Sequence, residues 1–195
     1  MKYTLTKTKK IAATLIVAMT ISPAVAFGGP GKPGMDTIVK IAQDVNADSG
    51  EFSYLLGAVG CLTADDGSNP VAALLSGTDK YTLFAPTDEA FKAVQRALGV
   101  AEGDEDPSIT CAALDDATIF NILAYHVTEG RRFSNSVFNK NNMKMIEMLN
   151  GGYIISNPDI TLTDNSGQAI GIVAPLFNLN ASNGVIHVID TVLLP

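Results

Sequence analysis

Two histidines, His126 and His187, are the side chains of this sequence best suited to acid–base chemistry near neutral pH. A histidine acts as a general base when it activates a serine or cysteine nucleophile, or a metal-bound water. The sequence contains neither the Gly-x-Ser-x-Gly turn that presents a nucleophilic serine nor the His-Glu-x-x-His pair that binds zinc. We therefore expect no enzyme activity, no cofactor and no metal site. Both histidines are interpreted as buried residues that hydrogen-bond to a carboxylate, with Asp190 as a candidate, or to the backbone.

Three further stretches carry residue types that bind ions or sugars in other proteins. Asp65-Asp66 and the acidic stretch 102–106 have the ligand type that calcium prefers, but they lack the spacing of a twelve-residue calcium-binding loop. We interpret both stretches as solvated loops. Asn180-Ala181-Ser182 fits the acceptor for an N-linked glycan, which applies only in a eukaryotic secretory route.

The first 26 residues predict the compartment in which these side chains work. Four lysines within the first ten residues precede the apolar stretch 11–21, and the small residues 24–26 follow it. This order is typical of a secretory signal peptide, residues 1–26, and the apolar stretch is about half of the roughly 20 residues that a bilayer span requires. We expect a secreted or periplasmic protein without a stable membrane span after cleavage, and a flexible leader at 27–35.

The charge of the chain narrows the classes of partner. The sequence has 13 basic and 20 acidic residues, and the predicted signal peptide contains four of the basic residues and no acidic one. The mature chain therefore has nine basic and 20 acidic residues, a net charge of −11. A surface of this charge repels nucleic acid and anionic lipid headgroups, so neither is expected as a partner.

The two cysteines, Cys61 and Cys111, favour a disulfide. Export places the chain in an oxidising compartment, and an even number of cysteines leaves none unpaired. Closing a loop of about 50 residues would stabilise the fold by about 4 kcal/mol in the chain-entropy model. The alternative is a pair of buried free thiols.

Apolar periodicity and capping residues predict helices in the first part of the chain and strands in the last third. The predicted helices begin at Asp36, Ser49, Val71, Thr87 and Asp115 or Asp116, with a strand at 80–85 between the third and the fourth. The stretches that favour strand are 133–138, 143–148, 153–156, 160–163, 169–173 and 184–193. Helices followed by strands, without regular alternation, indicate an α+β fold with a mostly antiparallel sheet, formed by one domain at 36–195.

Three motifs of the chain resemble the signatures of a known family. Residues 81–91, Tyr-Thr-Leu-Phe-Ala-Pro-Thr-Asp-Glu-Ala-Phe, resemble the first signature of fasciclin domains. Residues 123–127, Leu-Ala-Tyr-His-Val, resemble the central Tyr-His motif, and residues 183–195 resemble the closing signature. Their order and spacing fit as well, and the resemblance covers residues 36–195.

The resemblance implies a fasciclin-like fold, in which a helical layer packs on a wedge of mostly antiparallel strands. Asp88 stands where the family usually has asparagine, and the stretches 60–70 and 100–111 look longer than in a minimal fasciclin domain. Each longer stretch holds one cysteine, which is a further reason to expect the disulfide. We interpret the signature residues as mainly structural: Thr82, Phe84, Ala85, Pro86, Thr87, Asp88, Phe91, Asn183, Gly184, His187 and Asp190.

The resemblance also implies a role in adhesion, with a cell-surface or matrix protein as the partner. The family's Tyr-His motif and its flanks are associated with contacts to receptors, which nominates Tyr125 and His126 and the basic pair Arg131-Arg132. The arginines could hold a carboxylate or sulfate of the partner. The alternatives are that the motif packs against the closing strand and that the arginines are simply solvated.

A second function of another class is a carrier for a small apolar ligand or a glycan, because some fasciclin relatives bind apolar pigments. The ligand would lie in a groove between the helical layer and the sheet. Residues 170–179 and the methionines Met143, Met145 and Met148 are the candidates to line it, since methionine adapts to irregular surfaces. Ordinary core packing is the alternative for both groups.

Overall fold

The computed structural model describes residues 35–195. The expected signal peptide, residues 1–26, and nearly all of the expected leader, residues 27–35, lie outside the described residues. The helices of the described part are α1 (Ile38–Ser49), α2 (Ser53–Cys61), α3 (Pro70–Ser76), α4 (Asp88–Ala97), α5 (Pro107–Ala113), α6 (Asp116–Ala124) and α7 (Ser134–Val137). Its strands are β1 (Tyr81–Pro86), β2 (Val127–Glu129), β3 (Lys144–Glu147), β4 (Tyr153–Ser156), β5 (Thr161–Thr163), β6 (Ala169–Gly171), β7 (Leu179–Ala181) and β8 (Gly184–Ile189).

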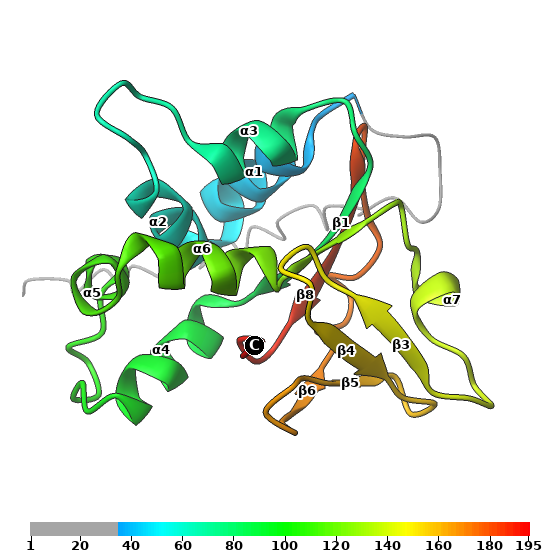
Figure 1. Ribbon diagram of the computed structural model, residues 1–195. Helices are drawn as coiled ribbons and strands as arrows, with labels where there is room; N and C mark the ends of the chain where they lie inside the picture. Colours follow the sequence, from blue (N-terminus) through cyan, green and yellow to red (C-terminus); the bar gives the residue numbers. More distant parts are fainter. Residues whose placement is uncertain (1–34) are drawn as a thin grey trace, which may run out of the picture.

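The strands form two four-stranded sheets. The first has the order β2-β1-β8-β7, and β1 runs parallel to β8 with Phe84 opposite His187. The other ladders are antiparallel, including all those of the second sheet, β3-β4-β5-β6. Figure 1 shows helices α1–α6 gathered on one side of β1 and β8, and the second sheet on the other side. This architecture confirms the predicted α+β class.

The two central strands, β1 and β8, have both faces buried. Alternate residues of a strand point to opposite faces. Leu83 of β1 and Ile186 of β8 pack with the helices, whereas Phe84 and Ile189 pack with the second sheet. The two signature strands therefore separate two apolar cores, which explains why 184–189 reads as almost continuously apolar.

The structure confirms some of the predicted helix-capping residues and corrects others. Thr87 caps α4 as predicted, and Asp115, one of the two residues expected to start the later helix, caps α6; each accepts a backbone N–H three positions on. Thr37 rather than Asp36 caps α1, and Ser49 is the last residue of α1 rather than the cap of α2. Ser49 does not cap α2 because its hydroxyl donates back to the Val45 carbonyl of its own helix, α1.

The expectation of a strand at residues 133–138 is wrong, because α7 forms there. The side chain of Asn178 accepts the Ser134 N–H at 2.7 Å and donates to the Ser134 hydroxyl at 2.9 Å. Val137 is fully buried in the core of the second sheet. These contacts come from a residue 44 positions away, so they override the local preference for strand.

The stretch 100–111, interpreted as a loop, contains the start of α5. Asp106 accepts the Ser108 N–H at 2.8 Å and Pro107 occupies the first helical position. An acidic cap followed by proline is a recognised start signal for a helix, so the sequence did carry the information.

Candidate functional site

The Tyr-His motif lies at the junction of α6 and β2, beneath the closing strand. The Tyr125 side chain is 0% exposed and its hydroxyl donates to the Tyr153 carbonyl at 2.6 Å. The same hydroxyl accepts the Asn165 N–H at 2.9 Å. Tyr125 thus ties the end of α6 to β4 and to the turn between β5 and β6.

His126 is 1% exposed and both of its ring nitrogens are hydrogen-bonded to the backbone. Nδ1 donates to the Ile122 carbonyl at 2.8 Å, and Nε2 accepts the Leu193 N–H at 3.0 Å. This pattern requires the neutral ring with its proton on Nδ1. Burial lowers the pKa of His126 from 6.5 to about 4, so the ring is neutral at physiological pH.

His187 is held in the same manner on β8. Its ring stacks on Phe84, with the ring centroids 5.6 Å apart. Nε2 donates to the Arg132 carbonyl at 2.7 Å, and Nδ1 accepts the Asn178 N–H at 3.4 Å. Burial lowers the pKa of His187 as well. The prediction of buried histidines bonded to the backbone is confirmed for both residues.

The alternative bond from a histidine to Asp190 is not formed. The Asp190 carboxylate accepts the Gly171 N–H at 2.8 Å and the Thr191 hydroxyl at 2.8 Å. Because all four imidazole nitrogens of the two histidines already have backbone partners, neither ring has a nitrogen free to take a proton from a substrate.

Burial also contradicts the expectation that Tyr125 and His126 contact a partner. Side chains with 0% and 1% exposure do not reach a binding surface in the folded protein. The alternative, that the motif packs beneath the closing strand and holds the fold, is the one that the structure supports.

The arginines of the motif's flank lie at the surface, beyond β2. Arg131 donates through Nη2 to the Ala181 carbonyl at 2.8 Å and to the Asn180 side chain, and its guanidinium lies over the Phe133 ring at 5.8 Å. Arg132 donates through Nε to the Glu129 carbonyl at 3.0 Å. Both arginines are partly exposed. The proposed glycan acceptor Asn180 is thus engaged by Arg131.

The signature residues of β1 and β8 make contacts within the fold. Asn183 is buried, accepts the Ile38 N–H at 2.9 Å and donates to the Leu75 carbonyl at 2.7 Å, so it joins α1 and α3 to the turn before β8. A Cβ on Gly184 would lie inside van der Waals distance of the Tyr81 carbonyl oxygen, which leaves room for glycine alone.

Two other polar signature residues, Thr82 and Asp88, also hydrogen-bond to the backbone of neighbouring elements. The Thr82 hydroxyl donates to the Gly130 carbonyl at 2.7 Å and accepts the Arg132 N–H at 2.8 Å. The Asp88 carboxylate, where the family usually has asparagine, accepts the Tyr54 N–H at 2.9 Å and so binds the first turn of α2 to the start of α4.

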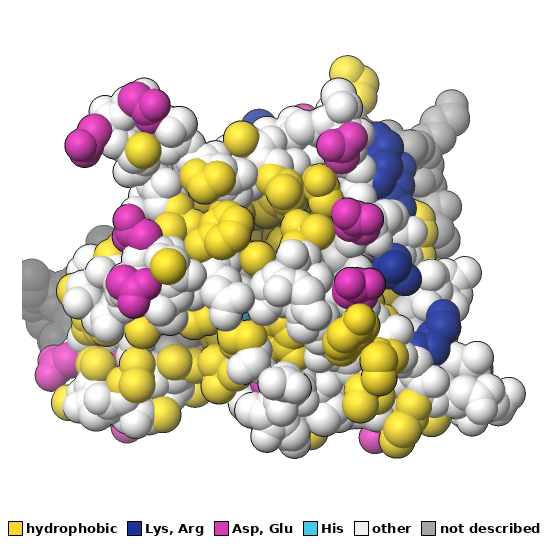
Figure 2. Space-filling model, viewed as in Figure 1, with side chains coloured by type: hydrophobic (Ala, Val, Ile, Leu, Met, Phe, Trp, Pro, Cys, Tyr) yellow, Lys and Arg dark blue, Asp and Glu magenta, His cyan; other side chains and the backbone are white. Residues whose placement is uncertain are grey.

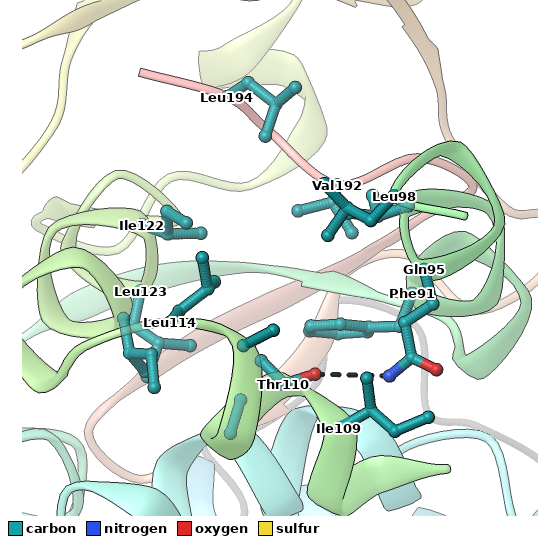
Figure 3. Close-up of a pocket in the computed structure, with 14 residues that line it drawn as sticks. Phe91, Gln95, Leu98, Ile109, Thr110, Leu114, Ile122, Leu123, Val192 and Leu194 are labelled. Carbon is teal, nitrogen blue, oxygen red and sulfur yellow. Dashed lines mark hydrogen bonds between the residues drawn. The ribbon is translucent and has the colours of Figure 1, made fainter. Parts of the chain in front are cut away.

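An apolar recess opens between α4, α5, α6 and the C-terminal segment, a site that sequence reasoning missed. Figure 3 shows its lining side chains pointing toward one another. The volume of the recess is about 60 Å³. The amide of Gln95 is turned to the Thr110 hydroxyl at 3.4 Å, and the exposed surface of the recess is apolar. Its lining residues are Ala58, Phe91, Val94, Gln95, Leu98, Ile109, Thr110, Ala113, Leu114, Ile119, Ile122, Leu123, Val192 and Leu194.

The groove expected between the helices and the sheet does not have its predicted lining. Met143 and Met145 are 67% and 69% exposed, and Met148 is buried in the core of the second sheet. None of the three lines the apolar recess. Three of the recess residues, Ile109, Thr110 and Ala113, belong to α5, which begins inside a stretch that was interpreted as a loop. Periodicity therefore did not bring them together with the other lining residues.

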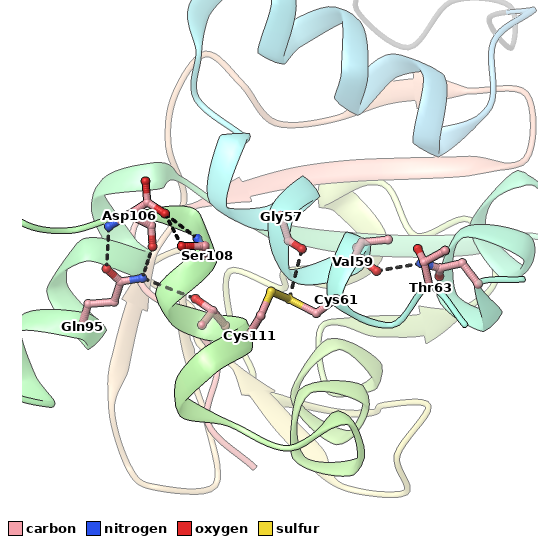
Figure 4. Close-up of a disulfide and its surroundings, with 10 residues drawn as sticks. Gly57, Val59, Cys61, Thr63, Gln95, Asp106, Ser108 and Cys111 are labelled. Atoms are coloured by element: carbon pink, nitrogen blue, oxygen red, sulfur yellow. Dashed lines mark hydrogen bonds between the residues drawn. A yellow bond between two sulfur atoms is a disulfide. The ribbon is translucent and has the colours of Figure 1, made fainter. Parts of the chain in front are cut away.

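The Cys61–Cys111 disulfide holds α5 on α2, beside the recess (Figure 4). In the described residues neither cysteine is free, so the predicted pairing is the one present. The other anchor of α5 is the buried Gln95, which donates to the Asp106 carbonyl at 2.9 Å and accepts its N–H at 3.2 Å. Because α5 has no buried residue of its own, these two anchors position it.

Between positions 35 and 195 no group of three or more histidine, cysteine or acidic residues is placed to hold a metal ion. No helix in this range combines the length and the apolar character that crossing a bilayer requires.

Comparisons with known proteins agree with the motifs. The family model described as "Fasciclin domain" matches residues 65–195. The chain is similar to Protein sll1483 of Synechocystis sp., with 31% identity over 159 residues that cover 82% of this chain and 73% of that protein.

A solved structure is also similar, a FAS1 domain pair from the insect cell adhesion molecule fasciclin I. The match has 19% identity and a TM-score of 0.44, and it covers 80% of this chain and 44% of that one. The present chain thus spans less than half the length of that chain. From the family match and the 31% identical relative, the chain belongs to the fasciclin domain family.

Proposed function

We propose that this protein is an exported fasciclin-domain module that mediates adhesion or extracellular protein–protein contact by binding a cell-surface or matrix protein. The proposal includes a signal peptide at 1–26, a leader at 27–35 and the binding domain at 36–195. Fasciclin domains in general occur in cell adhesion and extracellular proteins and are non-enzymatic. The observation that carries the proposal is the apolar recess of the helical layer.

The dimensions of the recess suit one apolar side chain of a partner. Its volume of about 60 Å³ is well below the roughly 300 Å³ at which pockets begin to enclose a drug-sized ligand. Protein interfaces concentrate their binding energy in a few apolar anchors that fill pockets of this kind. Leu98, at the rim, is 64% exposed, so a partner would cover it. Figure 2 shows hydrophobic side chains gathered in the hollows between the helices on this face.

Substitution at the rim tests the proposal. The mature domain would be labelled and its binding to host cells or matrix measured for Leu98→Gln and for the control Met145→Gln. Met145 is equally exposed but lies on β3, away from the recess. We expect Leu98→Gln to weaken binding about fivefold or more, since anchor residues contribute over 1 kcal/mol each, and Met145→Gln to leave it unchanged. Equal binding of both variants would contradict the proposal.

The recess also supports a second candidate, a carrier for a small apolar ligand. Its lining exposes apolar surface only, as a site for a hydrocarbon group requires. A dry cavity of about 150 Å³ is the size that accepts benzene, so the recess would have to widen by movement of α5 or the C-terminal segment. Native mass spectrometry of protein purified from its own host separates the two functions. Extra mass that is lost on denaturation supports the carrier, and the mass of the chain alone supports protein contact.

A further inference from the structure

Basic residues of the described chain divide into two groups by their partners. Lys40, Lys92 and Arg96 form ion pairs with carboxylates of their own helices or of the following loop. The other five form no ion pair within residues 35–195, although this range contains all 20 acidic residues of the chain. We refer to these five as the basic edge: Lys80, Arg131, Arg132, Lys140 and Lys144.

The fold brings four residues of the basic edge together from the ends of three separate strands. Lys80 precedes β1, the two arginines follow β2, and Lys144 opens β3. The Gly130 N–H donates to the Lys80 carbonyl at 2.7 Å, which places Arg131 beside Lys80. Their side chains then converge on adjacent carbonyls of the turn before β8: Lys80 Nζ donates to Ser182 at 3.0 Å and Arg131 to Ala181 at 2.8 Å.

The remaining charges continue the row along α7. Arg132 lies two residues before α7 and donates to the Glu129 carbonyl. Lys144, at the start of β3, donates to the Ser136 carbonyl within α7. Figure 2 shows the lysine and arginine side chains following one another along the right-hand edge of the molecule. Neutral carbonyl groups orient these cations without cancelling their charge.

Arg131 has donor capacity to spare within this row. A guanidinium carries five N–H donors, and the hydrogen bonds of Arg131 to Asn180 and Ala181 both leave from Nη2. Its Nε has no hydrogen-bond partner but is buried, so the donors that can face a ligand are those of the two terminal nitrogens. An arginine fork matches the geometry of carboxylate and sulfate groups. Phe177, 40% exposed, directly precedes Asn178, which is bonded to Ser134 at the start of α7. This exposed residue therefore lies next in the chain to the contact that fixes α7, the helix to which Lys144 also bonds.

We propose that the basic edge binds an acidic polysaccharide, carboxylated or sulfated, outside the cell. A row of cations that form no ion pair in the described residues matches a polymer that repeats its anionic groups. The inference goes beyond the proposed function, because it uses a surface distinct from the apolar recess. An acidic protein segment is the other occupant that the test distinguishes.

Acidic residues beside the row limit the affinity and provide a sensitive test. Glu129 is exposed and lies next to Arg131 and Arg132 in the chain, and Asp79 precedes Lys80. Figure 2 shows acidic side chains in a column parallel to the basic ones. A polyanion is repelled by these carboxylates, so Glu129→Gln should tighten its binding about two- to fivefold, the range expected for one exposed charge.

The experiment measures binding of a sulfated and a carboxylated oligosaccharide by calorimetry, with a neutral oligosaccharide of equal length beside them. We expect binding of the acidic sugars at about 0.01 M salt and a marked loss at about 0.15 M, as screening shortens from about 30 Å to about 8 Å. Lys80→Gln with Lys144→Gln should weaken binding about three- to tenfold. The control, Lys92→Gln with Arg96→Gln, removes the same charge from ion-paired positions on α4 and should change the affinity less than twofold.

Several outcomes would overturn the proposal. They are equal losses for the two double variants, no gain for Glu129→Gln, and binding of the neutral sugar as tight as that of the acidic ones. Tighter binding of a polyglutamate peptide than of either acidic sugar would assign the edge to an acidic protein segment instead. Melting temperatures of all variants establish that each is folded. Leu98→Gln should leave sugar binding unchanged, so failure here is separate from failure of the proposed protein contact.

Discussion

Acidification should destabilise this protein through its buried histidines before the carboxylates titrate. His126 has a folded pKa of about 4, against 6.5 for the exposed ring of an unfolded chain. Between these two values the unfolded chain binds more protons than the folded one, so the free energy of unfolding falls as the pH falls. Asp164 lies near enough to favour the charged ring, but burial outweighs it.

The magnitude follows from the two pKa values. Protonating the unfolded but not the folded ring lowers the free energy of unfolding by about 2 kcal/mol between pH 7 and pH 5, and by about 3 kcal/mol once the pH reaches 4. His187 is shifted in the same direction and adds to the loss. The surface carboxylates with lowered pKa values act only near and below pH 4, because that is where the unfolded carboxyl groups titrate.

The assay is urea denaturation at pH values from 7 to 5, for the wild type and for His126→Gln. Glutamine does not titrate, and it cannot reproduce both bonds to the Ile122 carbonyl and the Leu193 N–H. We therefore expect the variant to be less stable at pH 7 by about 1–3 kcal/mol. The difference between the two proteins should shrink by about 2 kcal/mol on going to pH 5, because only the wild type carries this ring.

Parallel pH dependence of the two proteins would refute the reasoning. If the variant does not fold, the ring resonances of the wild type decide the matter, since they report each histidine directly. A His126 resonance that shifts with a midpoint near 6.5 would show that the ring is not shielded as the structure places it.

The remaining predictions concern the disulfide, the close packing of Gly184 against β1, and the N-cap of α4. Replacing Cys61 and Cys111 by serine should lower the free energy of unfolding by up to about 4 kcal/mol, and the wild type in reductant should match the variant in urea denaturation. Gly184→Ala forces a methyl group against the carbonyl of β1, so its melting temperature should fall by more than about 8 °C; a fall under about 2 °C would contradict the packing. Thr87→Ala removes the cap of α4 and should cost about 1 kcal/mol by denaturation, whereas Thr87→Ser should cost little.

The sequence by itself determined those features that depend on residues close together in the chain. Thr87 was predicted as a cap, and the start of α6 was narrowed to Asp115 or Asp116, because a cap accepts an N–H group only three positions away. The almost continuously apolar run at 184–189 indicated a strand, since the pleat alone sets which residues share a face. Three signatures in order identified the family, and export with an even cysteine count predicted the Cys61–Cys111 pair.

The tertiary structure alone decided which of these residues are exposed. Nothing local distinguishes a Tyr-His pair on a surface from one beneath a strand. The difference lies in the Leu193 N–H, 67 positions from His126, and in the Tyr153 carbonyl that receives the Tyr125 hydroxyl. Helix α7 likewise depends on Asn178, 44 positions from Ser134.

The two surfaces proposed for binding arise only when distant elements meet. The apolar recess needs α4, α5, α6 and the C-terminal segment, and the basic edge needs the ends of β1, β2 and β3 together with α7. Periodicity reports one face of one element at a time, whereas a binding surface is the sum of faces that chain folding brings side by side. Sequence therefore predicted the framework of this protein, and long-range packing decided where a partner can touch it.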